Sequence, residues 1–162
     1  MGKIPKVVGE LAPEGEHKAK CVYVIDEGTQ PPPASQPDWE PARKVCIGFE
    51  LQGPKKKDGK PFYVNTVMTF TMSKRGNLGT FLKGWLGAVA KKLDDFDMDT
   101  CLGKDALVEV IHKGGYANIT DVSPAKGKHG PSVMKPWSFY LTPDEFDENV
   151  LNDTSKIWEK MK

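Results

Sequence analysis

Two stretches of the chain alternate between apolar and polar residues, which is the pattern of a β-strand with one buried face. The first stretch covers residues 43–51 and the second covers residues 62–72, in which Tyr63 takes the polar-facing parity. The apolar positions that share a face are Val45, Ile47, Phe49 and Leu51, and then Phe62, Val64, Met68, Phe70 and Met72. Residues 52–61 contain Asp58-Gly59 and predict a hairpin loop longer than two residues between these strands.

Three further segments are rich in β-branched and aromatic residues and predict strands over residues 17–26, 106–112 and 116–122. Gly114-Gly115 between the last two predicts a tight hairpin. After residue 77 the period changes, because apolar residues recur at the spacing of one helix face. This stripe consists of Leu78, Phe81, Leu82, Trp85 and Leu86, and the glycines that weaken the helix are Gly79, Gly84 and Gly87. The proline-rich residues 27–42 predict a long loop.

The predicted order is five strands with one helix between the third and the fourth. This is the element order of the OB-fold, a small Greek-key β-barrel that binds oligonucleotides or oligosaccharides on its second and third strands and adjoining loops. We therefore expect an all-β protein with small helices, forming a five-stranded OB-fold barrel over residues 1–140. Residues 141–162 are expected to form a C-terminal amphipathic helix or tail, with Thr142 as the N-cap and Pro143 in the first turn.

The charge balance narrows the classes of function. The 162 residues carry a net charge of +1, which excludes a uniformly basic surface for nucleic acid and an all-acidic disordered chain. The charge is uneven, at −3 over residues 144–162 and +4 over the remainder. The basic remainder attracts a polyanion, while the acidic residues 144–162 offer a separate surface for proteins. No apolar run is long enough to cross a membrane and no signal-peptide stretch is present, so we expect a cytosolic protein with no membrane partner.

The sequence lacks the motifs of known enzymes, metal sites and cofactor sites. Cys21, Cys46 and Cys101 show no CxxC spacing, and the histidines form no ligand pair, so we expect reduced thiols rather than zinc ligands or disulfides. No phosphate-binding loop, nucleophile elbow, zinc-protease or deaminase motif occurs. The acids within residues 94–99 lack the glycine and terminal glutamate of a calcium loop. We expect a non-enzymatic protein without a metal or cofactor.

Several short motifs between about residue 15 and residue 125, together with residues 156–160, resemble one family. They are Ala19-Lys20-Cys21 and the residues 26–30, 45–51, 69–73, 82–87, 96–99, 102–104 and 116–119. On these motifs the chain resembles the OB-fold single-stranded DNA-binding proteins encoded by bacteriophages. The resemblance implies a protein of the host cytoplasm that coats single strands in phage DNA replication or recombination, beside other replication or recombination proteins. Many such proteins end in an acidic tail with a terminal aromatic residue. Because this chain ends in Lys160-Met161-Lys162, recruitment of partners through such a tail is not carried over.

Binding a single strand without sequence preference needs cations along the phosphates and aromatic rings that stack with bases. In an OB-fold the second and third strands and the loops after strands one and four converge on one face. The residues predicted to share that surface are Trp39, Arg43, Lys44, Tyr63, Lys113 and Tyr116, and Lys74 and Arg75 before the helix are further phosphate-binding candidates.

Each candidate also has an ordinary structural interpretation. Trp39 could tuck against the barrel, Tyr63 and Tyr116 could be half-exposed packing residues, and the basic residues could be solvated charges. We interpret the lysine turn at residues 55–57 as a solubilising hairpin tip, Trp85 as a barrel plug and His112 as a packing residue.

Three hypotheses of function follow. The first is single-stranded DNA binding. The second is an OB-fold protein-interaction module, acting as a replisome accessory or as an inhibitor of a host factor, and the third is an RNA-binding, cold-shock-like role. The oligomeric state is open, because the C-terminal apolar stripe either docks on its own barrel or pairs with a second copy. That stripe consists of Phe146, Val150, Ile157, Trp158 and Met161.

Overall fold

The computed structural model describes residues 10–32, 34, 35, 38, 40–71, 77–87, 97–127 and 129–141. Most of these residues form β-strands. The elements follow along the chain as β1 (Gly15–Gln30), β2 (Ala42–Lys55), β3 (Pro61–Thr69), α1 (Leu78–Leu86), the 3-10 helix η2 (Met98–Cys101), β4 (Asp105–Lys113), β5 (Tyr116–Pro124) and β6 (Trp137–Phe139). The expected all-β class, with a helix between the third and fourth strands, is confirmed.

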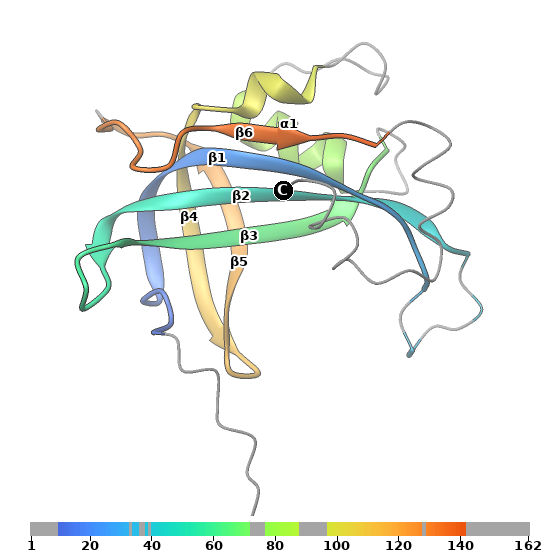
Figure 1. Cartoon of the computed structure of the whole chain (residues 1–162), viewed down its shortest axis with the longest axis horizontal. Coiled ribbons are helices and arrows are strands. Elements are labelled where there is room, and N and C mark those ends of the chain that lie inside the picture. Colours follow the sequence, from blue (N-terminus) through green and yellow to red (C-terminus); the bar gives the residue numbers. More distant parts are fainter. Residues whose placement is uncertain are drawn as a thin grey trace, which may run out of the picture.

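The strands form one sheet in the order β3-β2-β1-β4-β5, and its sharp curvature comes from β1 (Figure 1). The first part of β1 pairs with β4 over residues 15–20, and the longer second part pairs with β2 over residues 19–30. Two register shifts in the β1–β2 ladder mark bulges, which bend a strand and increase its twist. As a result β4 and β5 cross the direction of β1, β2 and β3 in Figure 1.

The sheet is not closed into a barrel, which corrects the closed cylinder expected from the sequence. Within the described residues, no hydrogen-bonded ladder joins β3 to β5. Side chains occupy this seam in place of backbone hydrogen bonds. Phe81 of α1 reaches into one half of it, and Leu11 and Ala12 line the other half. We call the gap between these two strand edges the β3–β5 seam.

The concave side of the sheet holds the main core, as the alternating pattern predicts. Val45, Ile47, Phe49 and Leu51 are all fully buried there. Helix α1 covers this core with its predicted stripe, since Leu78, Leu82 and Trp85 are buried. The Trp85 ring packs edge-on against Phe49 with 5.2 Å between ring centroids, and its indole N–H donates to a backbone carbonyl at 2.9 Å. The predicted helix and the plugging role of Trp85 are confirmed.

A second layer covers part of the convex side of β1 and β2, and it was not predicted. Residues 130–141, which we call the C-terminal strap, include the short strand β6, which pairs parallel with β1. The buried carboxylate of Glu50 accepts two consecutive backbone N–H groups of the strap, at 2.7 and 2.9 Å. The buried carboxylate of Asp26 accepts the N–H of Leu141 at 3.1 Å. Two polar residues of the sheet therefore hold the strap near its two ends.

An aromatic stack holds the middle of the strap. Trp137 of β6 stacks on Tyr23 of β1, with 5.5 Å between ring centroids and 24° between ring planes. The Tyr23 ring lies directly over Gly48, because a Cβ added at that glycine would meet the ring at 2.0 Å. The strap therefore docks where β2 has no side chain.

Other boundaries differ from the prediction in small ways. The third strand ends at Thr69 instead of residue 72, and β1 continues through Gly28 to Gln30, which shortens the proline-rich loop. The hairpin at Gly114-Gly115 is confirmed, since both glycines have the positive φ that a two-residue turn requires, at 63° and 82°. The expected C-terminal helix lies outside the described residues. Among the described helices, none has the length and apolar character needed to cross a membrane.

Candidate functional site

A groove of about 390 Å³ lies between the start of β3 and the hairpin that joins β4 to β5. Two of the predicted residues, Tyr63 and Tyr116, line it together, although they are far apart in the sequence. Asn65 and Asn118 line it beside them, one on each strand. Two tyrosines and two asparagines therefore lie among the residues that line one end of the β3–β5 seam. We call it the tyrosine groove.

The parity of β3 places Tyr63 on the face opposite the core. Its neighbours Phe62 and Val64 are buried in the core, so Tyr63 projects to the other face and is half-buried. Its hydroxyl donates to the Glu50 carboxylate at 3.0 Å. Partial burial and this hydrogen bond raise the pKa of Tyr63 to about 12. The phenol is therefore neutral at physiological pH, and the hydrogen bond fixes the orientation of its ring.

Tyr116 is presented by the tip of the β4–β5 hairpin and is 63% exposed. The amide of Asn118 donates to the carbonyls of Lys113 and Tyr116, both at 3.1 Å, and this cross-links the turn. A ring held out on a braced two-residue turn loses little conformational freedom when a ligand stacks on it. This arrangement suits a stacking platform better than a packing residue.

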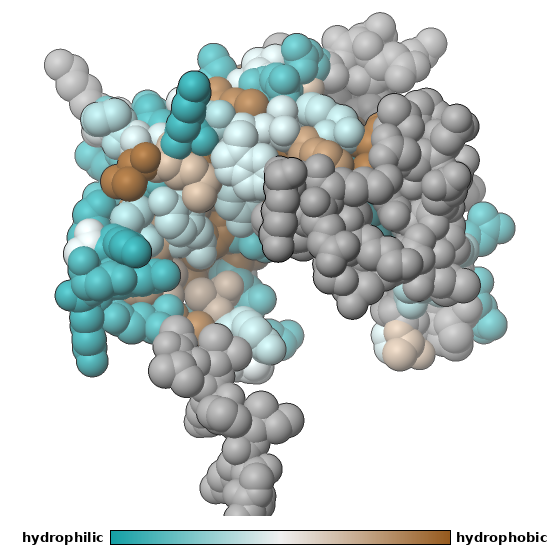
Figure 2. Space-filling view, viewed as in Figure 1, coloured by the Kyte–Doolittle hydropathy of each residue, from teal (hydrophilic) through white to brown (hydrophobic). Residues whose placement is uncertain are grey.

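Basic residues border the groove at the turn between β2 and β3. Lys55 ends β2, Lys56, Lys57 and Lys60 follow it in the turn, and Lys56 also lines the groove. The Lys56 ammonium lies 6.0 Å from the centre of the Phe62 ring. Figure 2 shows the hydrophilic residues of the turn gathered at the left edge of the molecule. Lys113, which is exposed on the β4–β5 hairpin, adds a cation on the other side.

An acidic residue from another segment, Glu10, binds this basic turn. The Glu10 carboxylate accepts the backbone N–H of Lys57 at 2.9 Å and also lines the groove. Residues 10–14 are held in place by His112, whose ring nitrogen bonds the Ala12 carbonyl at 2.6 Å and whose backbone N–H donates to Glu14 at 2.9 Å. One wall of the groove is therefore a segment that precedes β1, with a carboxylate where an anionic ligand would meet the lysines.

Arg43 and Lys44 lie at the other end of β2. Lys44 pairs with Thr69 across the β2–β3 ladder while Tyr63 pairs with Glu50, so about 20 Å of strand separates the two places. Arg43 forms an ion pair with the buried Asp26 at 2.5 Å, and its guanidinium lies 4.5 Å from the centre of the Phe70 ring. Lys44 donates to the Thr69 hydroxyl at 3.0 Å. Arg43 therefore has a structural role that the sequence did not indicate.

Three predicted residues, Trp39, Lys74 and Arg75, lie outside the described residues. Sequence reasoning also missed both asparagines of the groove. Asn65 shares the outward parity of Tyr63 and donates to the Tyr23 hydroxyl at 3.0 Å. Asn118 follows Tyr116 by two residues, on the same side of β5. Parity could have indicated Asn65, because it had already placed Tyr63, and the hairpin that placed Tyr116 could have indicated Asn118.

No group of three or more His, Cys, Asp or Glu side chains within the described residues is placed to hold a metal ion. All three cysteines are free and buried, as expected from their spacing. Burial raises the pKa of Cys46 and of Cys101 to about 12, so neither thiol ionises at neutral pH.

Comparison with known proteins adds no assignment to this geometry. No protein-family model matches the chain, and no curated protein or solved structure matches it.

Proposed function

We propose that the protein binds single-stranded DNA without strong sequence preference, through the tyrosine groove and the lysines at its border, and that it catalyses no reaction. The observation that carries the proposal is the convergence of Tyr63 and Tyr116 on one groove bordered by Lys56. Base stacking on such rings contributes about 1–3 kcal/mol per base, and it is tolerant of sequence because every base has a flat face. Lysines next to the rings supply the contacts to phosphate.

The strand order supports an OB-fold for this protein. In that fold the β1–β2–β3 meander is followed by a helix and then by a β4–β5 hairpin beside β1, and β3 and β5 face one another. The chain has this order, with the β3–β5 seam left open. The tyrosine groove lies where the third strand meets the loop after strand four, which is a ligand-binding region of OB-folds. A role in phage DNA replication or recombination is the biological setting that fits such an activity.

The test is a fluorescence anisotropy titration of labelled oligo-dT at low and at high salt. We expect binding at low salt that weakens steeply as salt rises, because phosphate contacts release counterions. Tyr116→Ala should weaken binding about 5- to 150-fold, which corresponds to one lost stacking interaction. Tyr116→Phe is the matched control and should keep most of the affinity, because it keeps the ring.

A second pair of variants tests the charge. Lys113→Ala beside the groove should weaken binding and make it less dependent on salt. Lys126→Ala removes the same charge beyond the far end of β5, about 25 Å along the strand from Tyr116, and should have little effect. No binding of oligo-dT at low salt would refute the proposal. Stronger binding of oligo-U than of oligo-dT would favour the RNA-binding alternative instead.

A further inference from the structure

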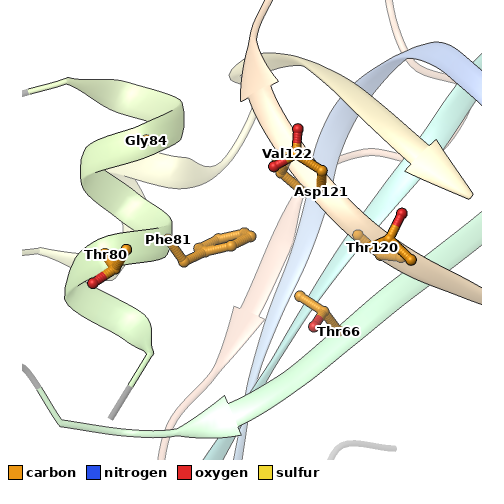
Figure 3. A pocket seen from close by; sticks show the side chains of 8 residues that line it. Thr66, Thr80, Phe81, Gly84, Thr120, Asp121 and Val122 are labelled. Atoms are coloured by element: carbon orange, nitrogen blue, oxygen red, sulfur yellow. The ribbon is translucent and has the colours of Figure 1, made fainter. Parts of the chain in front are cut away.

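A second cavity, of about 300 Å³, lies between α1, β3 and β5 (Figure 3). The tyrosine groove is lined by β3 up to Asn65 and by β5 up to Asn118. The second cavity begins with the next residues, Thr66 on β3 and Ile119 on β5, and ends under α1. The two cavities therefore follow one another along the seam, with no lining residue in common, and we call the pair the furrow. We call the second one the seam pocket.

A glycine of α1 lines the seam pocket. Gly84 lies inside the helix and lines the pocket, and a Cβ added there would meet nothing within 4 Å. Glycine in a helix interior costs about 1 kcal/mol relative to alanine. Packing therefore does not require a glycine at this position.

The chemistry of the seam pocket differs from that of the tyrosine groove. None of the eight residues that line it is basic, and its one charged side chain is Asp121. Asp121 is exposed and extends from β5 on the side that faces α1, whereas the Phe81 ring points from α1 into the pocket (Figure 3). Thr66 and Thr80 add hydroxyl groups at the rim. Such a pocket repels phosphate and suits a flat group that carries N–H donors.

We propose that the seam pocket binds a single guanine base of the strand held in the tyrosine groove. The inference rests on the proposed function, because the furrow delivers the base from one cavity to the next. A volume of about 300 Å³ is at the small end of ligand sites, which suits one ring system and not a larger molecule. The Phe81 ring supplies the aromatic contact, and the Asp121 carboxylate accepts the N–H donors of the base.

Guanine fits this carboxylate better than the other bases. A carboxylate has two acceptor oxygens and no donor. Guanine presents two adjacent donors on its pairing edge, the ring N1–H and the exocyclic amino group, so it can bond both oxygens at once. Cytosine and adenine each present one amino group there, and thymine presents a single ring N–H between two carbonyls that the carboxylate repels. A good bidentate contact discriminates between bases by about 5- to 150-fold.

The experiment compares two labelled oligonucleotides of equal length, one all thymine and one with a single central guanine. Because binding through the tyrosine groove tolerates any sequence, the strand can shift until the guanine reaches the pocket. We expect the guanine-containing strand to bind at least 5-fold more tightly to the unmodified protein. Asp121→Asn should abolish this preference without weakening the binding of oligo-dT, whereas Glu16→Gln, an exposed acid outside the furrow, should preserve it.

A second variant tests the cavity without removing the charge. Gly84→Leu fills the seam pocket in a helix position that favours a larger residue, so the protein should fold normally and lose the preference for guanine. Equal binding of the two strands by the unmodified protein, or a preference that survives either variant, overturns the inference while leaving the proposed function intact. Failure of both strands to bind would overturn the proposed function and, with it, this inference.

Discussion

Gly48→Ala should destabilise the fold by about 2–4 kcal/mol, although it adds a single methyl group to a strand. A Cβ at this position would lie 2.0, 2.2 and 2.3 Å from three ring atoms of Tyr23, which is far inside van der Waals contact. The ring cannot move away freely. It is stacked on Trp137 at 5.5 Å, and its hydroxyl accepts a hydrogen bond from Asn65 at 3.0 Å. The substitution must therefore displace an aromatic ring that two neighbours hold.

The magnitude follows from the contacts at stake. Forcing an extra methyl group into a packed site costs about 1–3 kcal/mol. Displacing the ring also weakens the aromatic pair, worth about 0.5–1.5 kcal/mol, and the hydrogen bond to Asn65, worth a similar amount. The expected loss is a large part of the roughly 5–15 kcal/mol that stabilises an average domain.

Urea unfolding followed by tryptophan fluorescence measures this loss as a lower midpoint at unchanged slope. Gly53→Ala is the matched control, because it lies in the same strand and its added Cβ would meet nothing within 4 Å. It should change stability by no more than about 1 kcal/mol, with stabilisation expected from the less flexible unfolded chain. Combining Gly48→Ala with Tyr23→Leu removes the clash, so the double variant should be more stable than the sum of the single effects predicts. Equal stabilities for the two alanine variants would show that Tyr23 does not lie over Gly48.

Four further outcomes are expected from the contacts described above. Glu50→Gln should lower the free energy of unfolding by about 1–3 kcal/mol in the same urea assay, because an amide cannot accept all the hydrogen bonds that the buried carboxylate accepts. An unchanged midpoint would contradict the role of Glu50 in holding the strap. Glu10→Gln should tighten the binding of oligo-dT at low salt, since it removes a negative charge from the lysine turn, and weaker binding would contradict this interpretation. Burial raises the pKa values of Tyr23 and Tyr63 to about 12, so the folded state keeps protons that the unfolded state loses near pH 10. The free energy of unfolding should therefore fall as the pH rises from 10 to 12. Cys46 should react with a thiol reagent at pH 8 only in denaturant, because burial raises its pKa to about 12, and fast labelling of the native protein would show that the packing around Cys46 opens.

Local periodicity predicted the elements that build the concave core. Alternation in β2 and β3 and the helical stripe of α1 are short-range patterns, and each reports which face of one element avoids water. The same parity correctly placed Tyr63 on the convex face. These predictions succeed because the hydrophobic effect acts on each element in the same way, whatever its eventual partner.

The C-terminal strap could not be predicted in this way. Its strand β6 has three residues, too few to show any period, and its docking depends on Glu50 and Asp26. The strap residues that they bind are 83 to 115 positions away in the sequence. In the strand pattern Glu50 is indistinguishable from a solvent-facing polar residue. A buried carboxylate that accepts distant backbone N–H groups cannot be recognised from the residues next to it in the sequence.

The same limit applies to the candidate site. Arg43 follows a proline-rich loop, and its charge and position are those expected of a phosphate contact. It pairs instead with Asp26, which is 17 residues earlier and fully buried. Charge alone does not show whether a cation faces solvent or an internal carboxylate. Tyr116 was easier to place, because a two-residue glycine turn puts the residues beside it at the tip of a hairpin.

The open β3–β5 seam carries both the tyrosine groove and the seam pocket, and two explanations of the seam differ in one expected result. Unpaired strand edges cost hydrogen bonds and invite aggregation, so an opening that served no ligand would be a packing defect. Filling a defect adds apolar contacts, and Gly84→Leu should then raise stability without changing the binding of any oligonucleotide. If the seam is instead a binding furrow, the same substitution should stabilise the fold and remove the preference for guanine. The stability measurement alone does not distinguish these explanations, whereas stability and base preference measured on one variant do.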